Sequence, residues 1–303
     1  MPGFLAARPT LLGVFLILGS AFSFSIAGVL IRWIEEAGGW QIVFYRSLAL
    51  SLTLLVFLAL RYRRGIVTAF TAPGWGAAVG TVCMALAQVC VIWAFLHTKV
   101  ANVVFVFGAL PFVSGVLAWL LLREPIRGAT WMAMCLAFGG IALMTADELG
   151  AGRYLGNLLA IATTLFYGGL VVTARVSRAS DMAPVLCSGA LLACVICALL
   201  VEGFAIGWWD FLLCAVMGGV QTFFSYWLMT LAARYIRAAE LTLLGSAELI
   251  LGPLWVWLAV NETPTAATVM GGVVIMAAIA VQAFATARAR DIAPAGPRDG
   301  GRR

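Results

Sequence analysis

Long apolar stretches separated by short charged segments run along almost the whole chain. A charge at the centre of a bilayer costs about 2.5–3.5 kcal/mol, so charge-free intervals mark the segments that can cross it. A crossing helix needs about 17–25 such residues. The pattern predicts ten spans, at 11–31, 42–60, 75–96, 100–122, 128–146, 154–174, 183–201, 211–233, 241–260 and 266–286. The alternation typical of a membrane β-barrel is absent, so we expect an all-α membrane protein.

Composition agrees with this interpretation. Of 303 residues, 63% are hydrophobic and 11% are charged, which is too little polar surface for a water-soluble globule of this size. Lipid is therefore the expected solvent for much of the surface. The net charge of +6 comes from basic residues in short loops and at the C-terminus, not from a basic stripe with interleaved aromatic residues. It indicates membrane orientation, and no nucleic-acid partner is expected.

The basic residues also predict the orientation. If the N-terminus is cytoplasmic, fifteen lysines and arginines lie in cytoplasmic segments and three (Arg32, Lys99 and Arg153) lie outside, with Arg46 inside a span. Such a bias predicts a multi-pass protein of the cell (inner) membrane with both termini cytoplasmic. The apolar run after Arg8 is as long as a full span, so we interpret it as the first helix and not as a signal peptide.

The cysteines do not indicate a metal or disulfide site. All seven lie in apolar stretches, and the only CxxC, formed by Cys194 and Cys197, lies within a predicted span. We interpret them as small core residues, and we expect no metal and no cofactor.

A weak internal repeat relates the two halves. A shift of 138 residues places Trp119 on Trp257 and Glu124 on Glu262, within WLLLREP at 119–125 and WLAVNETP at 257–264. Five spans per half give the halves opposite orientations. We therefore predict a first five-helix repeat at 1–146, a second at 147–287 and a disordered basic tail at 288–303. Each glutamate is expected to cap the helix that follows it, the fifth or the tenth, rather than to bind substrate.

The chain resembles the EamA-type carriers of the drug/metabolite transporter superfamily. The resemblance rests on GWQIVFYRSLAL at 39–50, REP at 123–125 and AELILGPLWVWLAVNETPT at 247–265, and it extends from about 11 to 286. It implies ten transmembrane helices in two inverted five-helix repeats. It also implies a carrier of amino acids, nucleobases, drugs or other metabolites, often an exporter. The second half departs from the first in having no arginine at the position that corresponds to Arg46.

Two charged residues inside predicted spans are the first candidates for function. Arg46 could hold a substrate carboxylate, or it could anchor its helix at headgroup level. Glu248 could bind a substrate amine or couple transport to protons, or it could make a structural hydrogen bond. The repeat places Gln88 on Tyr226, and Asn102 on Glu240, at related depths. The predicted cavity residues are Gln88, Trp93, Asn102, Tyr167, Gln221, Tyr226, Glu248 and Arg46.

These features favour a secondary transporter that exports small amphipathic metabolites by alternating access around a central cavity. Amino acids, aromatic ones included, are the first candidates. The alternatives are a membrane-embedded enzyme that acts on lipid and a drug or nucleobase carrier of the same fold. An enzyme should carry clustered His, Asp or Cys within its spans, and this chain has one histidine. We therefore expect no enzyme activity. The expected partners are a small-molecule substrate and the lipid bilayer; the oligomeric state is open.

Overall fold

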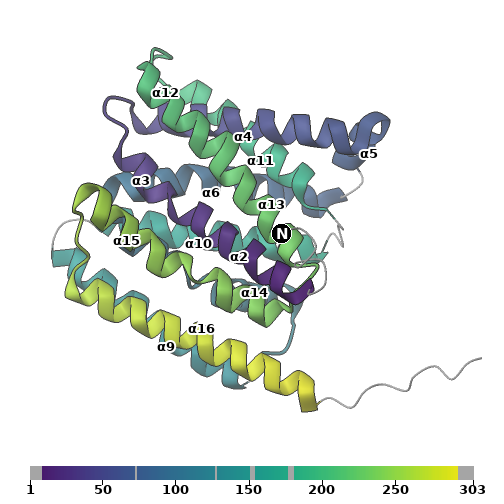
Figure 1. Ribbon diagram of the computed structural model, residues 1–303, viewed down its shortest axis with the longest axis vertical. Helices are drawn as coiled ribbons and strands as arrows, with labels where there is room; N and C mark the ends of the chain where they lie inside the picture. Colours follow the sequence, from purple (N-terminus) through teal and green to yellow (C-terminus); the bar gives the residue numbers. More distant parts are fainter. Residues whose placement is uncertain (1–8, 72–73, 127, 151–153, 177–180, 293–303) are drawn as a thin grey trace, which may run out of the picture.

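The computed structural model describes residues 9–71, 74–126, 128–150, 154–176 and 181–292. These residues form helices joined by short connections, and no strand occurs among them (Figure 1). In chain order the elements are α2 (Pro9–Ser25), α3 (Ala27–Arg32), α4 (Gly39–Tyr62), the 3-10 turn η1 (Arg63–Gly65), α5 (Ile66–Thr71), α6 (Gly74–His97), α7 (Val100–Phe107), α8 (Leu110–Leu122), α9 (Gly128–Gly150), α10 (Tyr154–Val176), α11 (Ala183–Leu200), α12 (Trp208–Ala215), the π-helix η2 (Val216–Thr222), α13 (Phe223–Ala232), α14 (Ala238–Gly245), α15 (Glu248–Val260) and α16 (Ala266–Ile292).

Within the described residues, eight helices are long and apolar enough to cross a membrane, and the bent pair α7–α8 makes nine if it is one span. Each of the ten predicted intervals falls on one helix or on consecutive helices. The interval at 128–146 falls on α9, whose apolar part, Thr130–Thr145, is shorter than the others. The count of ten crossings therefore stays a prediction, while the multi-pass, all-helical architecture is confirmed.

Large apolar side chains cover the outer surface of the bundle. Phe15, Leu199 and Trp208 are among the most exposed, and many others lie on outward-facing helix surfaces. Apolar patches this extensive are not found on water-soluble monomers, and they fit a surface in contact with lipid.

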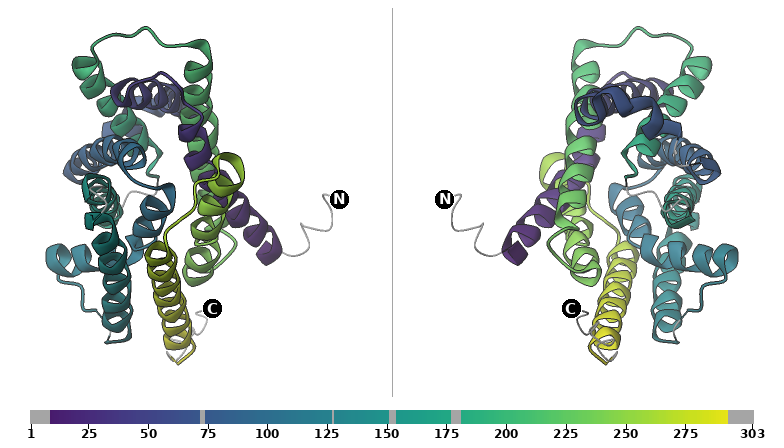
Figure 2. Two further views of the ribbon diagram at one scale, coloured as in Figure 1. Left: turned by 90° about the vertical axis from the view of Figure 1, so that its left-hand side faces the viewer. Right: turned by 90° about the vertical axis from the view of Figure 1, so that its right-hand side faces the viewer.

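Helices from opposite halves of the chain pack against each other. Helix α2 lies along α13, and α10 lies along α6 (Figure 2). Further cross-half pairs include α4 with α11, and α9 with α16, which run side by side along the lower edge of Figure 1. The two halves are therefore interlocked and share one interior.

Helix breaks recur at equivalent places in the two halves. The bend of 43° between α7 and α8 falls at Gly108 and Ala109. The break between α14 and α15 falls at Ser246 and Ala247, which the repeat offset relates to those two residues. The left-handed C-cap residues of α8 and α15, Arg123 (φ 56°) and Asn261 (φ 55°), are related in the same way. A broken helix leaves backbone groups that are tolerated at membrane depth only inside protein or beside a cavity.

The repeat-related glutamates, Glu124 and Glu262, were each expected to cap the helix that follows, but their contacts in the structure are different. Glu262 does not cap α16: it accepts a hydrogen bond from the Val100 backbone N–H at the start of α7 (2.8 Å), and it pairs with Arg32 at 2.8 Å. The α16 N-terminus is instead capped by Thr265, whose Oγ1 accepts from the Thr268 N–H. Glu124 forms an exposed ion pair with Arg175 at 2.9 Å. A carboxylate at the end of one span thus serves a neighbouring helix rather than its own.

The C-terminal helix is longer than the sequence indicated. Helix α16 continues to Ile292, past the predicted start of the disordered tail at 288. Residues 293–303 of that predicted tail lie outside the described residues.

The π-helix η2 lies tightly against α4. An added Cβ on Gly218 would overlap the backbone carbonyl of Arg46, whereas an added Cβ on Gly139 in α9 would meet nothing within 4 Å. Backbone atoms cannot move aside as a side-chain end can, so this contact requires glycine.

We therefore expect Gly218→Ala to destabilise the protein by about 1–3 kcal/mol, the usual cost of overpacking. Gly139→Ala is the matched control, because it adds the same methyl group to a helical glycine in open space. Thermal unfolding in detergent should show a lower midpoint for Gly218→Ala alone. Equal midpoints for the two variants would contradict the close contact.

Candidate functional site

A cavity of about 540 Å³ lies between the two halves of the chain. Its walls come from α2, α4, α7 and α8 of the first half, and from α10, α11, α13, α14 and α15 of the second. It extends from Glu248 and Tyr226 to Arg61 and Asp181, at the end of α4 and just before α11. Its volume is that of a typical small-molecule site.

Aromatic pairs line this cavity, and each pair joins one half to the other. The rings meet edge to face with centroid separations of 5.2–5.5 Å. The pairs are Phe24–Tyr226, Phe57–Phe223 and Phe107–Tyr167. Such walls suit an apolar or planar solute, since aromatic faces and edges offer large contact areas at low entropic cost.

Glu248 brings a carboxyl group into this apolar cavity. It lies in the first turn of α15, directly after the break that separates α14 from α15. Its side chain lines the cavity and makes no hydrogen bond or ion pair with the residues that the structure describes. A carboxylate in such surroundings is available to a cationic group of a ligand or to a proton.

Arg46 lies inside the bundle, where it is 7% exposed. Its guanidinium donates to Gln88 Oε1 (3.0 Å) and to Thr222 Oγ1 (3.3 Å). Tyr167 donates its hydroxyl to the same Gln88 oxygen at 3.2 Å. These contacts join α4, α6, α10 and η2 into one buried polar cluster, which we call the Arg46 cluster (Arg46, Gln88, Tyr167 and Thr222).

Tyr226 and Gln221 adjoin the Arg46 cluster. The Tyr226 side chain interacts with Tyr167, and electrostatically with both Arg46 and Glu248. Gln221 Oε1 accepts from Thr222 Oγ1 (3.0 Å), and its Nε2 donates to the Ser23 carbonyl of α2 (2.9 Å). Both tyrosine rings line the cavity together with Glu248, whereas Arg46 does not line it.

Of the eight predicted cavity residues, Tyr167, Tyr226 and Glu248 line this cavity. Arg46, Gln88 and Gln221 do not line it but lie in or beside the Arg46 cluster, and the other two lie elsewhere. Trp93 packs edge to face on Trp40 with ring centroids 5.0 Å apart, and it does not line the cavity. Asn102 is fully buried. Its Nδ2 donates to Thr98 Oγ1 (3.2 Å), and its Oδ1 accepts from Thr268 Oγ1 (2.6 Å). Asn102 thus links α7 to α16, the role of a polar group that holds helices together.

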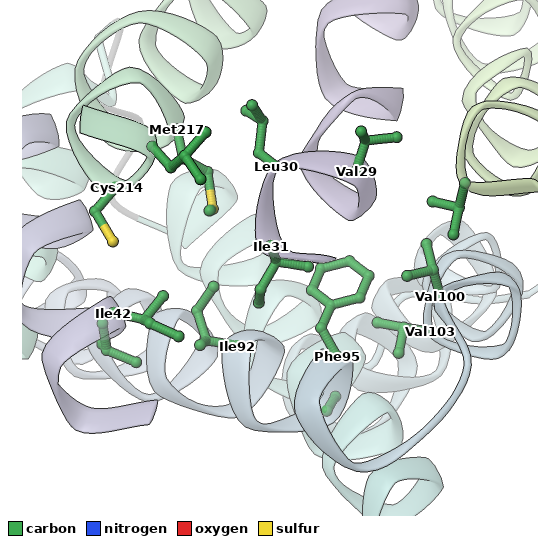
Figure 3. Close-up of a cluster of buried hydrophobic side chains, with 14 of the residues drawn as sticks. Val29, Leu30, Ile31, Ile42, Ile92, Phe95, Val100, Val103, Cys214 and Met217 are labelled. Atoms are coloured by element: carbon green, nitrogen blue, oxygen red, sulfur yellow. The ribbon is translucent and has the colours of Figure 1, made fainter. Parts of the chain in front are cut away.

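Beyond the Arg46 cluster, apolar packing closes the bundle. Side chains from α3, α4, α6, α7 and the α12–η2 segment meet there without a cavity (Figure 3). Members of this cluster include Val29, Leu30, Ile31, Ile42, Ile92, Phe95, Val100, Val103, Cys214 and Met217. Interiors packed in this way leave no room for a solute, so the cavity is shut on this side.

Polar contacts reinforce the closed end. Arg32, besides its pair with Glu262, donates to the backbone carbonyls of Phe95 (2.9 Å) and Thr98 (2.8 Å). Asp210, which is 2% exposed, accepts three backbone N–H bonds from the α3–α4 connection at 2.8–3.0 Å. The Arg32–Glu262 pair and the three Asp210 contacts cross between the halves, so opening this end requires that they separate.

Among the residues that the structure describes, the other end of the cavity carries fewer polar contacts. Asp181 pairs with Arg61 at 3.2 Å and accepts from the Tyr62 hydroxyl at 2.6 Å. The Arg61 side chain is 41% exposed, and both Arg61 and Asp181 line the cavity. The cavity therefore reaches the surface at this end.

The sequence did not identify several residues of this site. Phe24, Phe57, Phe107 and Phe223 were not predicted, because a helix that is apolar on all sides gives no sign of which side faces a cavity. Thr222 was also missed. The one available signal was the polar pair Gln221–Thr222, one residue after Gly218–Gly219, which in the structure lies in the π-helix.

Comparisons with known proteins agree on the architecture. The model of the EamA-like transporter family matches residues 11–146 and 154–284. No curated protein gives a match. One solved structure, described as a "Crystal structure of protein", is similar to this chain with a TM-score of 0.64 and 17% identity, over 92% of this chain and 98% of that one. At that identity the likeness concerns the fold alone.

Asp210 offers a test of the closed end. Asp210→Ala would leave three backbone N–H groups without an acceptor, which we expect to cost about 2–4 kcal/mol of stability. Asp210→Asn, which keeps one acceptor oxygen, should fall between Asp210→Ala and the wild type. Glu202→Ala is the control, because Glu202 is an exposed acid before α12. Thermal unfolding measures the order; a midpoint for Asp210→Ala equal to that of the control would contradict this role.

Proposed function

Because the chain belongs to the EamA-like transporter family, we propose that it is a secondary carrier that exports small amphipathic metabolites by alternating access. Amino acids, aromatic ones included, are the first candidates. The observation that carries the proposal is the cavity itself: both matched repeats line it, tight packing closes it at one end, and it reaches the surface at the other. A site exposed to one side at a time is what alternating access requires.

An arrangement of ten spans in two inverted repeats is part of this proposal. It is supported by the packing between the halves, in which the contact of α2 with α13 corresponds to that of α10 with α6, since α2 and α6 belong to the first half and α10 and α13 to the second. The related breaks between α7 and α8 and between α14 and α15 support it as well. Both breaks lie beside the cavity, as expected where two repeats rock about a shared site.

We further propose that the cavity faces the cytoplasm of a cell whose inner membrane holds the protein, with both termini inside. The support is the distribution of basic residues: the cavity mouth lies where α4, α10 and α13 end, and those ends carry arginines such as Arg61 and Arg175. An exporter in this state would be ready to bind its solute from the cytoplasm.

The chemistry of the cavity supports an amphipathic solute that carries an amine. Its walls are largely apolar, with several aromatic rings, and Glu248 is a carboxyl group without a partner among the described residues. A protonated amine beside Glu248 with an apolar body against the rings would satisfy both features. The same observation favours cationic drugs as a second class of substrate, since aromatic walls also attract cations.

Purified protein in liposomes would test the carrier directly. We expect uptake of labelled phenylalanine, tryptophan or leucine to exceed that of protein-free liposomes. Nucleobases and cationic drugs complete the panel, and each would identify a different class of substrate. If none of the solutes moves, with or without a pH gradient, the carrier hypothesis is wrong.

Glu248→Gln removes the charge and keeps the shape of the side chain. A protonated amine and a proton compete for the ionised carboxylate, so amino-acid affinity in the wild type should weaken as the pH falls. In Glu248→Gln we expect affinity at least tenfold lower at high pH, and independent of pH. Binding titrations across pH measure both; a variant with wild-type affinity and pH profile would exclude Glu248 from substrate binding and from proton coupling. Glu240→Gln, at an exposed acid before the same break, is the control.

A further inference from the structure

The Arg46 cluster contains two buried donors with nothing to donate to. Gln88 is fully buried, and its oxygen accepts from both Arg46 and Tyr167, which leaves its Nε2 pointing elsewhere. Neither Gln88 Nε2 nor Arg46 Nε has a hydrogen-bond partner. Unsatisfied buried donors are rare in native proteins and expensive, so two of them in contact call for an explanation.

The charge of Arg46 is also unbalanced. The arginines Arg32, Arg61 and Arg175 each pair with a carboxylate, whereas no carboxylate lies within ion-pair distance of Arg46 among the described residues. A buried charge is costly unless it is paired, and a structural arginine would be expected to have its own counter-ion. A positive charge with two free donors, one on a planar guanidinium, matches the acceptors of a carboxylate group.

The position of Tyr167 connects these donors to the cavity. Its ring lines the cavity, while its hydroxyl occupies the Gln88 oxygen next to Arg46. Tyr226 stands beside it and interacts with both Arg46 and Glu248. A rotation of the two tyrosine side chains would therefore join the space around Glu248 to the donors of Arg46 and Gln88.

The local backbone is unusual at the same place. The π-helix η2 brings Thr222 to Arg46, and Gly218 brings η2 against the α4 backbone. Single π-helical turns inside longer helices occur frequently at functional sites, because they re-aim side chains at the expense of regular hydrogen bonding.

We propose that Arg46 and Gln88 form the subsite for the carboxylate of the transported solute, and that Tyr167 and Tyr226 form a partition that moves aside to admit it. This inference rests on the proposed carrier function and specifies its substrate class. The solute is a zwitterion with an apolar or aromatic body: its ammonium group lies at Glu248 and its carboxylate lies at Arg46. The site thus has a defined polarity along the axis from Glu248 to Arg46.

Gln88→Glu is the most direct test, because it supplies an internal carboxylate to Arg46 without changing the shape of the side chain. A purely structural Arg46 would gain a partner and ligand binding would not change. If Arg46 and Gln88 form a carboxylate subsite, the introduced glutamate side chain would pair with Arg46 and exclude the carboxylate of the ligand. The ligands are phenylalanine and 2-phenylethylamine, which differ only in the carboxylate, titrated by calorimetry into wild-type and variant protein in detergent.

We expect phenylalanine to bind Gln88→Glu at least tenfold more weakly than the wild type, the loss that follows from removing charge-assisted hydrogen bonds. Binding of 2-phenylethylamine should be unchanged or tighter. An equal change for both ligands, or no change for either, would overturn the subsite. If Gln88→Glu melts below the wild type, Gln88→Met replaces it, and a severalfold loss confined to phenylalanine is expected.

Liposome transport separates this inference from the carrier function. Wild-type protein that moves no solute in the panel contradicts the carrier function itself. Wild-type protein that moves phenylalanine, with Gln88→Glu moving it at unchanged KM, contradicts the carboxylate subsite alone. Transport of phenylalanine by the wild type with a KM raised at least tenfold in Gln88→Glu supports both.

Discussion

Within the hydrocarbon core of a bilayer, a polar group without a partner inside the protein cannot form a hydrogen bond to water instead. Most of this chain meets that constraint with uninterrupted helices, whose backbone groups bond within each helix. Ser47, Trp93 and Asn157 carry unpartnered buried polar atoms, but several other exceptions gather around one space: the break before Glu248, the bend at Gly108, the π-helix beside Arg46, and the unpartnered donors of Arg46 and Gln88. Polar cost is tolerated there because a cavity and its solute can supply what lipid cannot.

The two ends of the bundle are held by different kinds of contact. One end combines tight apolar packing with bonds across the halves: Arg32 pairs with Glu262, which also accepts from the Val100 N–H, and Asp210 accepts three backbone N–H bonds. The other end has the Arg61–Asp181 pair, which is half exposed to solvent and so contributes little. Because of this difference, the described conformation is closed at one end and open at the other. To alternate, a carrier would have to break the contacts at the closed end and form comparable contacts at the open end.

Periodicity and charge were sufficient to predict the helices, since every predicted interval falls on a helix and the charges mark its ends. The repeat offset also relates the two helix breaks to each other, although the breaks themselves were found only in the structure. The site was less accessible. Arg46 and Glu248 could be named because a charge within a span is costly. The aromatic walls could not, because an apolar helix offers no contrast between lipid and cavity. Glu262 shows the same limit, for it caps a helix distant in sequence.

The lack of symmetry in the charges fits the proposed polarity of the site. The repeats supply Arg46 from the first half and Glu248 from the second, and neither has a charged counterpart at the related position. If the two groups met directly, they would neutralise each other and leave nothing to bind a solute. Tyr167 bonds to Gln88 next to Arg46, whereas Tyr226 and Glu248 line the cavity, so in the proposed site the two tyrosines form the partition between the charges. In the proposed site a zwitterion binds both groups, with its ammonium at Glu248 and its carboxylate at Arg46. On this interpretation, tight binding requires a solute that carries both charges. An apolar molecule of the same size would fit the largely apolar cavity but would leave Arg46 and Glu248 without partners, and would therefore bind weakly.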